Sequence, residues 1–111
     1  MPQPLSFEIS RGGGRATVTI AGDLDMAGTL RLEPPVDGLL EDERLDLLVL
    51  DLGSVDFIDS VGLRLLVETH VRAQHRGLRL AIVGAGGNVK RIVQLAGYDA
   101  VLPFTDDRTA L

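Results

Sequence analysis

The sequence contains no cysteine and no tryptophan, and it has no long hydrophobic run. Without cysteine, the chain cannot form a disulfide framework, a redox centre or a thiolate metal site. No apolar segment approaches the roughly 20 residues that span a bilayer. Residues 1–5 lack the charged and apolar regions of a signal peptide. We therefore expect a cytoplasmic protein that has no membrane partner.

Positive charge is also scarce, because 11 Lys and Arg residues stand against 16 Asp and Glu residues. The formal net charge is −5 and the arginines are scattered, so we expect no nucleic-acid partner. What the sequence does have is a 45% share of hydrophobic residues in 111 positions, and few of these are aromatic. This composition predicts a single domain over residues 1–111 with an aliphatic core.

The hydrophobic pattern predicts strands that alternate with helices. Alternation over residues 5–9 and 16–20, around a glycine turn at 11–14, is typical of an antiparallel hairpin. The nearly continuous apolar run at 45–52 is typical of a strand buried on both faces. The remaining expected elements are helices at 28–41, 60–75 and 88–96, strands at 78–83 and 101–104, and a last helix capped by 105–107. This order predicts an α/β fold with a small mixed, mostly parallel sheet of four to five strands.

Prolines and polar residues mark the expected interruptions. Pro34 and Pro35 each lack a backbone donor and crowd the preceding turn. We therefore expect the first helix to break there or to begin at Pro34. Residues 22–25 and 53–59 are rich in Gly, Asp and Ser, and we expect both segments to be loops.

The most informative segment is residues 51–66, where a buried strand leads to an Asp-Ser pair immediately before a helix. Ser60, or Asp59 beside it, is the natural N-cap of that helix. Gly62 in the first turn leaves the backbone uncovered for something to approach closely. Capping alone explains the pair, because Ser and Asp are preferred caps of any helix.

The segment also resembles the signature of the STAS domain, in particular that of bacterial anti-sigma-factor antagonists. That signature is an apolar strand, Asp-Leu, a short loop and then Asp-Ser-x-Gly-Leu, which here occupies residues 59–63. The resemblance extends to residues 22–25, 80–84 and 93–104, and so covers nearly the whole chain in the right order. It implies a small sheet packed against helices on one side.

The resemblance also implies a function. It implies that unphosphorylated protein binds an anti-sigma factor with serine kinase activity and frees a sigma factor. The same resemblance implies that phosphorylation of Ser60 by that kinase abolishes binding and that a serine phosphatase resets the switch. The docking face that it implies comprises Asp23, Asp25, Asp59, Ser60, Val61, Gly62 and Arg64. The sequence departs from the family at Val61, where a second hydroxyl is frequent, and at Leu111, beyond which relatives often continue.

Two other interpretations are also compatible with a small α/β domain. One is a STAS scaffold module of a sensory or transport complex, without a phosphorylation switch. The other is a response-regulator receiver, which would accept phosphate on Asp51 after the buried strand. A receiver also needs an acidic cluster near the first strand and a lysine after a later strand. The only lysine, Lys90, falls at a predicted helix start, so the receiver interpretation is weak.

Enzymatic, metal and cofactor functions have little support in the sequence. His70 and His75 are five positions apart, which places them on different faces of a helix. The glycines at 84–87 match neither the dinucleotide fingerprint nor Walker A. Ser60 lacks the Gly-x-Ser-x-Gly context of a hydrolase nucleophile. We therefore expect a protein that is not an enzyme and binds no cofactor.

Overall fold

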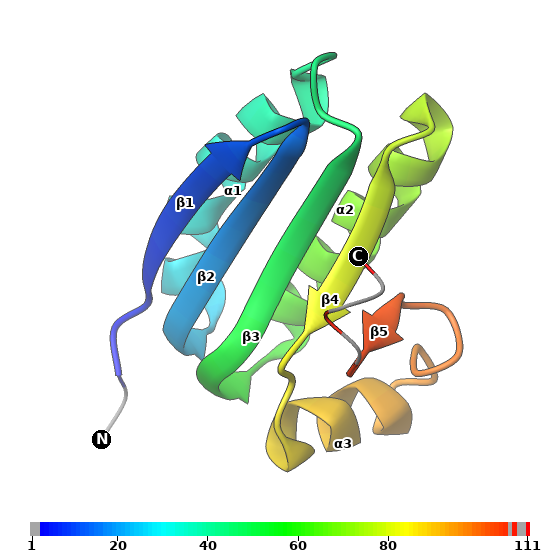
Figure 1. Cartoon of the computed structure of the whole chain (residues 1–111). Coiled ribbons are helices and arrows are strands. Elements are labelled where there is room, and N and C mark those ends of the chain that lie inside the picture. The colour runs from blue at the N-terminus through cyan, green and yellow to red at the C-terminus, as the bar shows by residue number, and fades with distance from the viewer. Residues whose placement is uncertain (1–2, 107, 109–110) are drawn as a thin grey trace.

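The structure is a computed structural model that describes residues 3–106, 108 and 111. Its elements are β1 (Ser6–Gly12), β2 (Arg15–Leu24), α1 (Met26–Glu41), β3 (Leu47–Ile58), α2 (Ser60–Arg76), β4 (Arg79–Val83), α3 (Gly87–Leu95) and β5 (Phe104–Thr105). The five strands form one sheet in chain order (Figure 1). β1 is antiparallel to β2, and every other neighbouring pair is parallel. The predicted α/β fold with a mixed, mostly parallel sheet is confirmed.

The main core lies between the sheet and two helices, α1 and α2, which cover the same face (Figure 1). Its fully buried side chains are aliphatic, as the composition predicts. They include Val18, Ile20, Leu24, Leu32, Val36, Leu39, Leu48, Leu52, Ile58, Leu66 and Ile82. α3 lies beyond the end of β4 and adds Val89 and Val93 to the same core. Across the described residues, no helix has the length and apolar character to cross a bilayer.

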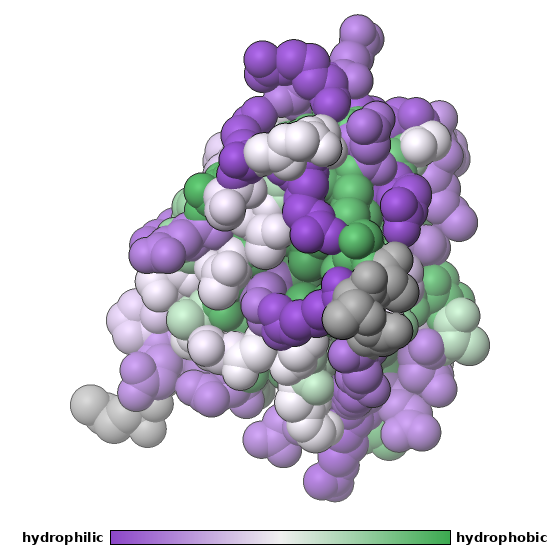
Figure 2. Space-filling model, in the orientation of Figure 1, coloured by the Kyte–Doolittle hydropathy of each residue, from purple (hydrophilic) through white to green (hydrophobic). Residues whose placement is uncertain are grey.

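The other face of the sheet carries a smaller apolar cluster, visible as a central apolar band between polar side chains (Figure 2). The cluster consists of Leu47, Val49, Ala81 and Val83, and Leu111 packs against it. Nearby, Arg108 Nη1 donates to Asp51 Oδ2 at 2.9 Å. Burial raises the pKa of Asp51, but hydrogen bonds from Arg108 and Gly53 outweigh it and leave that pKa below its usual value. Arg108 and Leu111 thus both make contacts on the helix-free face.

Both segments predicted as loops are in fact the ends of paired strands. Residues 21–24 of β2 pair with residues 54–58 of β3, after register shifts between Thr19 and Ala21 and between Gly22 and Asp23. Bulges of this kind accommodate extra residues while the ladder continues beyond them. The turn-forming composition of the two segments led to a wrong prediction. The segments form strands because the backbone groups of each one pair with those of the other.

The predicted break at Pro34 and Pro35 is also wrong, because α1 runs without interruption from Met26 to Glu41. Apolar side chains on both sides of the prolines, Leu32 and Val36, are buried in the core. Their burial holds the two halves of the helix in line despite the missing donors. The prolines themselves lie at the more accessible side of the helix, where water can reach the carbonyls that lose a helical partner.

The last elements differ in extent from the prediction. β5 spans only Phe104–Thr105, because the backbone N–H groups of Val101 and Leu102 donate to the carbonyl of Tyr98 and form a turn. These residues therefore do not join the ladder with β4. The final helix that the sequence predicts after residue 105 falls on a stretch in which residues 107, 109 and 110 lie outside the described part of the chain.

Candidate functional site

α1 and α2 begin side by side at the edge of the sheet where β2 and β3 end (Figure 1). Asp25 caps α1 by accepting from the Gly28 N–H at 2.8 Å. Asp59 caps α2, and its Oδ1 accepts from the N–H groups of Val61 and Gly62, each at 2.9 Å. The second oxygen, Oδ2, accepts from the Met26 N–H at 3.2 Å. Asp59 therefore ties the starts of the two helices together.

Ser60 is the first residue of α2, and its side chain is exposed. Because Asp59 occupies the capping position, the Ser60 hydroxyl is not needed by the free N–H groups of the helix. The hydroxyl makes no hydrogen bond with any residue in the described part of the chain. Capping thus accounts for Asp59 but leaves Ser60 without a role in the fold.

Asp23 and Gly62, both expected on the docking face, are buried. Asp23 is 8% exposed, and its Oδ2 accepts from the Gln3 N–H at 3.0 Å. Its own N–H donates to the Gln3 carbonyl at 2.9 Å. A Cβ on Gly62 would lie 2.1 Å from the Leu24 carbonyl oxygen. The group that approaches Gly62 closely is therefore the protein's own β2.

Arg64 lies one helical turn beyond Ser60 and so shares its face of α2. Its Nε donates to Glu68 Oε1, four positions further along α2, at 3.1 Å. Arg72, four positions beyond Glu68, pairs instead with Asp37 of α1. The structure thus brings together Asp25, Asp59, Ser60, Val61 and Arg64, which we call the Ser60 surface.

Exposed apolar side chains flank the Ser60 surface, and the sequence analysis did not identify them as part of a site. Met26 and Leu30 lie one turn apart on α1, and Phe57 is near the end of β3. All three are exposed large hydrophobic residues. The helical periodicity of α1 could have identified the first two, because Met26 and Leu30 lie on one face of the helix while Leu32 and Val36 lie on another. An apolar surface beside a free hydroxyl suits a macromolecular partner.

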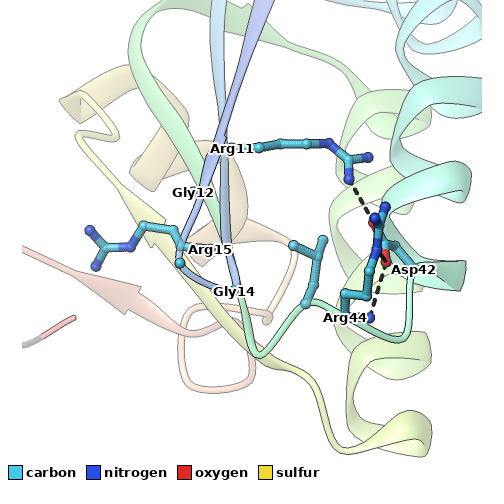
Figure 3. Close-up of a pocket in the computed structure, with 8 residues that line it drawn as sticks. Arg11, Gly12, Gly14, Arg15, Asp42 and Arg44 are labelled. Atoms are coloured by element: carbon cyan, nitrogen blue, oxygen red, sulfur yellow. Dashed lines mark hydrogen bonds and ion pairs between the residues drawn. The ribbon is translucent and has the colours of Figure 1, made fainter.

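A second polar cluster lies at the opposite end of β2, beside the turn that joins it to β1 (Figure 3). Arg11 Nη1 lies 2.6 Å from Asp42 Oδ2, and Arg44 Nε lies 3.0 Å from Asp42 Oδ1. Hydrogen bonds from Arg44 and then from Arg11 hold the pKa of Asp42 well below its usual value. Both cations are therefore engaged by Asp42, whereas Arg15 points away from it (Figure 3). The described residues hold no grouping of His, Asp and Glu that suits a metal ion.

Asp42 should make the stability of the fold depend on pH. The pKa of Asp42 is lower in the folded chain than its unfolded value of about 3.9. Its contribution to the free energy of unfolding is therefore complete above the unfolded pKa. The contribution is lost as the pH falls through the folded pKa. We expect Asp42→Asn to lower the free energy of unfolding near neutral pH, and the difference from wild type to shrink below about pH 4.

Urea unfolding followed by circular dichroism across this pH range measures the Asp42 effect. Glu43→Gln is the matched control, since Glu43 is exposed and its carboxylate makes no hydrogen bond among the described residues. The control should unfold like wild type at every pH. A difference between wild type and Asp42→Asn that stays constant with pH would contradict the assignment.

Comparison with known proteins places this fold in a family. The family model of the STAS domain matches residues 7–110. The chain is 28% identical to the anti-sigma-F factor antagonist RsfB of Mycobacterium tuberculosis over 98 residues, 88% of this chain and 79% of the relative. It is 22% identical to the anti-sigma F factor antagonist of Paenibacillus polymyxa over 103 residues, 93% of this chain and 88% of the relative.

A solved structure agrees with these relatives. The crystal structure of an anti-sigma factor antagonist from Mycobacterium paratuberculosis superposes with a TM-score of 0.81. The two sequences are 25% identical, and the match covers 99% of this chain and 92% of that one. The family model, the relatives and the fold agree with the resemblance carried by residues 59–63. The chain belongs to the STAS domain family.

Proposed function

We propose that this protein is an anti-sigma-factor antagonist controlled by phosphorylation of Ser60. In its unphosphorylated form it binds an anti-sigma factor that has serine kinase activity, and a sigma factor is freed. The observation that carries the proposal is the exposed Ser60 hydroxyl, which no described residue engages, at the start of α2. Its relatives from Mycobacterium tuberculosis and Paenibacillus polymyxa bear the same functional name.

The chemistry belongs to the partner kinase. The Ser60 oxygen attacks the γ-phosphorus of ATP, the bond to the bridging oxygen breaks, and ADP leaves. The hydroxyl proton passes to a base on the kinase. A serine phosphatase restores the hydroxyl by hydrolysis and releases inorganic phosphate. In this role the protein acts in the cytoplasm, as substrate and ligand rather than as an enzyme.

Charge explains how the modification changes binding. A phosphate adds about −1.5 to −2 charges at neutral pH. At the N-terminus of α2, the helix dipole favours that charge by only about 0.3–1 kcal/mol. In a complex, the phosphate must lie desolvated beside Asp25 and Asp59, which costs on the order of several kcal/mol. The larger effect is on docking, so the folded protein persists while the complex dissociates.

Labelling with ATP tests the proposal. Purified protein is incubated with ATP and with each purified anti-sigma factor of the serine-kinase type from the same organism. Mass spectrometry then locates the phosphorylated residues. We expect one of these kinases to label Ser60 to near stoichiometry. Ser60→Ala should abolish labelling, whereas Ser54→Ala, which removes another exposed serine, should leave it unchanged. Labelling elsewhere, or by no such kinase, would refute the switch.

A further inference from the structure

We propose that the anti-sigma factor also docks in a groove between the end of β3 and α3. The occupant that the groove fits is an apolar segment of that partner with a carboxylate facing Arg91. This inference rests on the proposed function, because it assigns a second contact to the same partner. The groove contributes to the affinity for the partner, whereas phosphorylation of Ser60 controls whether the partner binds.

The groove has a volume of about 230 Å³. Its apolar lining comes from Phe57 of β3 and from Ile92 and Leu95 of α3. These side chains are 48%, 36% and 77% exposed, respectively. An exposed, contiguous apolar lining of this kind is typical of a docking site. We call this feature the β3–α3 groove.

α3 carries apolar side chains that its packing on the sheet leaves partly or largely uncovered. Its inward face is Val89 and Val93, which are fully buried and four positions apart. Ile92 borders that stripe and is 36% exposed, whereas Leu95 lies outside it and is 77% exposed. A nine-residue helix needs only one apolar stripe to pack on the sheet. The uncovered apolar surface of Ile92 and Leu95 is therefore available to another molecule.

Charge indicates what the occupant carries. Arg91 lines the β3–α3 groove, and it makes no ion pair or hydrogen bond with the residues that the structure describes. The adjacent Lys90 is different, since its Nζ lies 3.4 Å from Asp106 Oδ1. Asp56 also lines the groove but forms no ion pair with Arg91, and α3 itself contains no acidic residue. A free arginine beside apolar side chains suits a carboxylate on the partner, because guanidinium binds carboxylate in a planar, two-point geometry.

The β3–α3 groove is continuous with the Ser60 surface. Phe57 is three positions before Ser60, and the chain between them passes directly from β3 into α2. A stable protein interface buries about 800 Å² on each partner, more than a serine and its neighbours provide. The groove extends the surface in the direction of α3. The chain's own C-terminal Leu111 is not its occupant, since Leu111 packs on the helix-free face of the sheet.

Titration calorimetry with the purified kinase that labels Ser60 tests this second contact. We expect the double variant Ile92→Gln/Leu95→Gln to bind at least tenfold more weakly than wild type. Arg91→Glu should weaken binding to a similar extent, and Arg91→Lys by an intermediate amount, because lysine keeps the charge but loses the two-point geometry. Val71→Gln is the matched control, since Val71 is 42% exposed on α2 and does not line the groove. Arg91→Glu, Arg91→Lys and Val71→Gln should keep the wild-type melting temperature, whereas Ile92→Gln/Leu95→Gln should lower it slightly, because Ile92 is only 36% exposed. Because the Arg91 variants keep the fold intact, their loss of affinity reports on the contact alone.

The two proposals fail in different ways. If wild type binds the kinase and the groove variants bind equally well, the groove is not a contact, while the role of Ser60 stands. If the groove variants change only self-association, seen by sedimentation of the protein alone, the occupant is a second copy and this inference is overturned. If no anti-sigma kinase binds or labels wild type, the proposed function itself is refuted.

Discussion

Replacing Gly62 with alanine is expected to lower the free energy of unfolding by about 3 kcal/mol or more. The added Cβ would lie 2.1 Å from the Leu24 carbonyl oxygen and 2.8 Å from Leu24 Cγ. The carbonyl belongs to β2 and accepts from the Asp59 N–H at 3.3 Å, so it cannot move without disturbing the cap of α2. The new methyl group therefore has to push α2 away from the sheet.

A second glycine in a helix provides the control for this result. Gly38 lies within α1, and a Cβ placed there meets nothing within 4 Å. Gly38→Ala should therefore stabilise the protein by about 0.5–1 kcal/mol, since alanine loses less backbone entropy. Urea unfolding followed by circular dichroism measures both variants, as the chain has no tryptophan. Equal effects of the two substitutions would show that the close approach to Leu24 is not a constraint.

The location of the Ser60 surface could be predicted from the sequence, but its internal division of roles could not. Ser60 and Asp59 can both accept from free helix N–H groups, so the pattern permits either as the cap. In the structure α2 begins at Ser60, and Asp59 Oδ1 accepts from the N–H groups of Val61 and Gly62, so Asp59 is the cap. Asp59 Oδ2 also accepts from the Met26 N–H, 33 positions away, and a contact of that sequence separation cannot be predicted from the local pattern.

The errors in the predicted fold have the same origin, namely contacts between residues that are far apart in the sequence. Residues 22–25 and 53–59 have turn-forming composition, and only their pairing with each other makes them strands. Pro34 and Pro35 oppose a helix locally, and only the burial of their neighbours overrides them. By contrast, α2 was correctly predicted, because its apolar spacing, its cap and Gly77 at its end all agree. The apolar lining of the β3–α3 groove was missed, because its side chains come from two elements that are distant in the sequence and that only the fold brings together.

A negative charge at position 60 should separate binding from folding. Ser60→Asp is expected to weaken binding to the anti-sigma kinase at least about 100-fold, equivalent to about 2.7 kcal/mol. The same change should leave the melting temperature unaltered or slightly raised, because a carboxylate in the first turn of α2 is favoured by the helix dipole. Calorimetric titration with the kinase and thermal unfolding of the free protein give the two values.

Ser60→Asn isolates the charge from the change in size. Asparagine has nearly the same shape as aspartate but is neutral, so this variant should bind much closer to wild type. Equal losses for the two variants would mean that bulk at position 60, and not charge, excludes the partner. Retained binding by Ser60→Asp would refute electrostatic control altogether. The expected contrast arises because water screens the exposed side chain from Asp25 and Asp59 in the free protein, whereas docking strips that water away. The charge is thus tolerated in one state and costly in the other, which is the physical requirement for a switch.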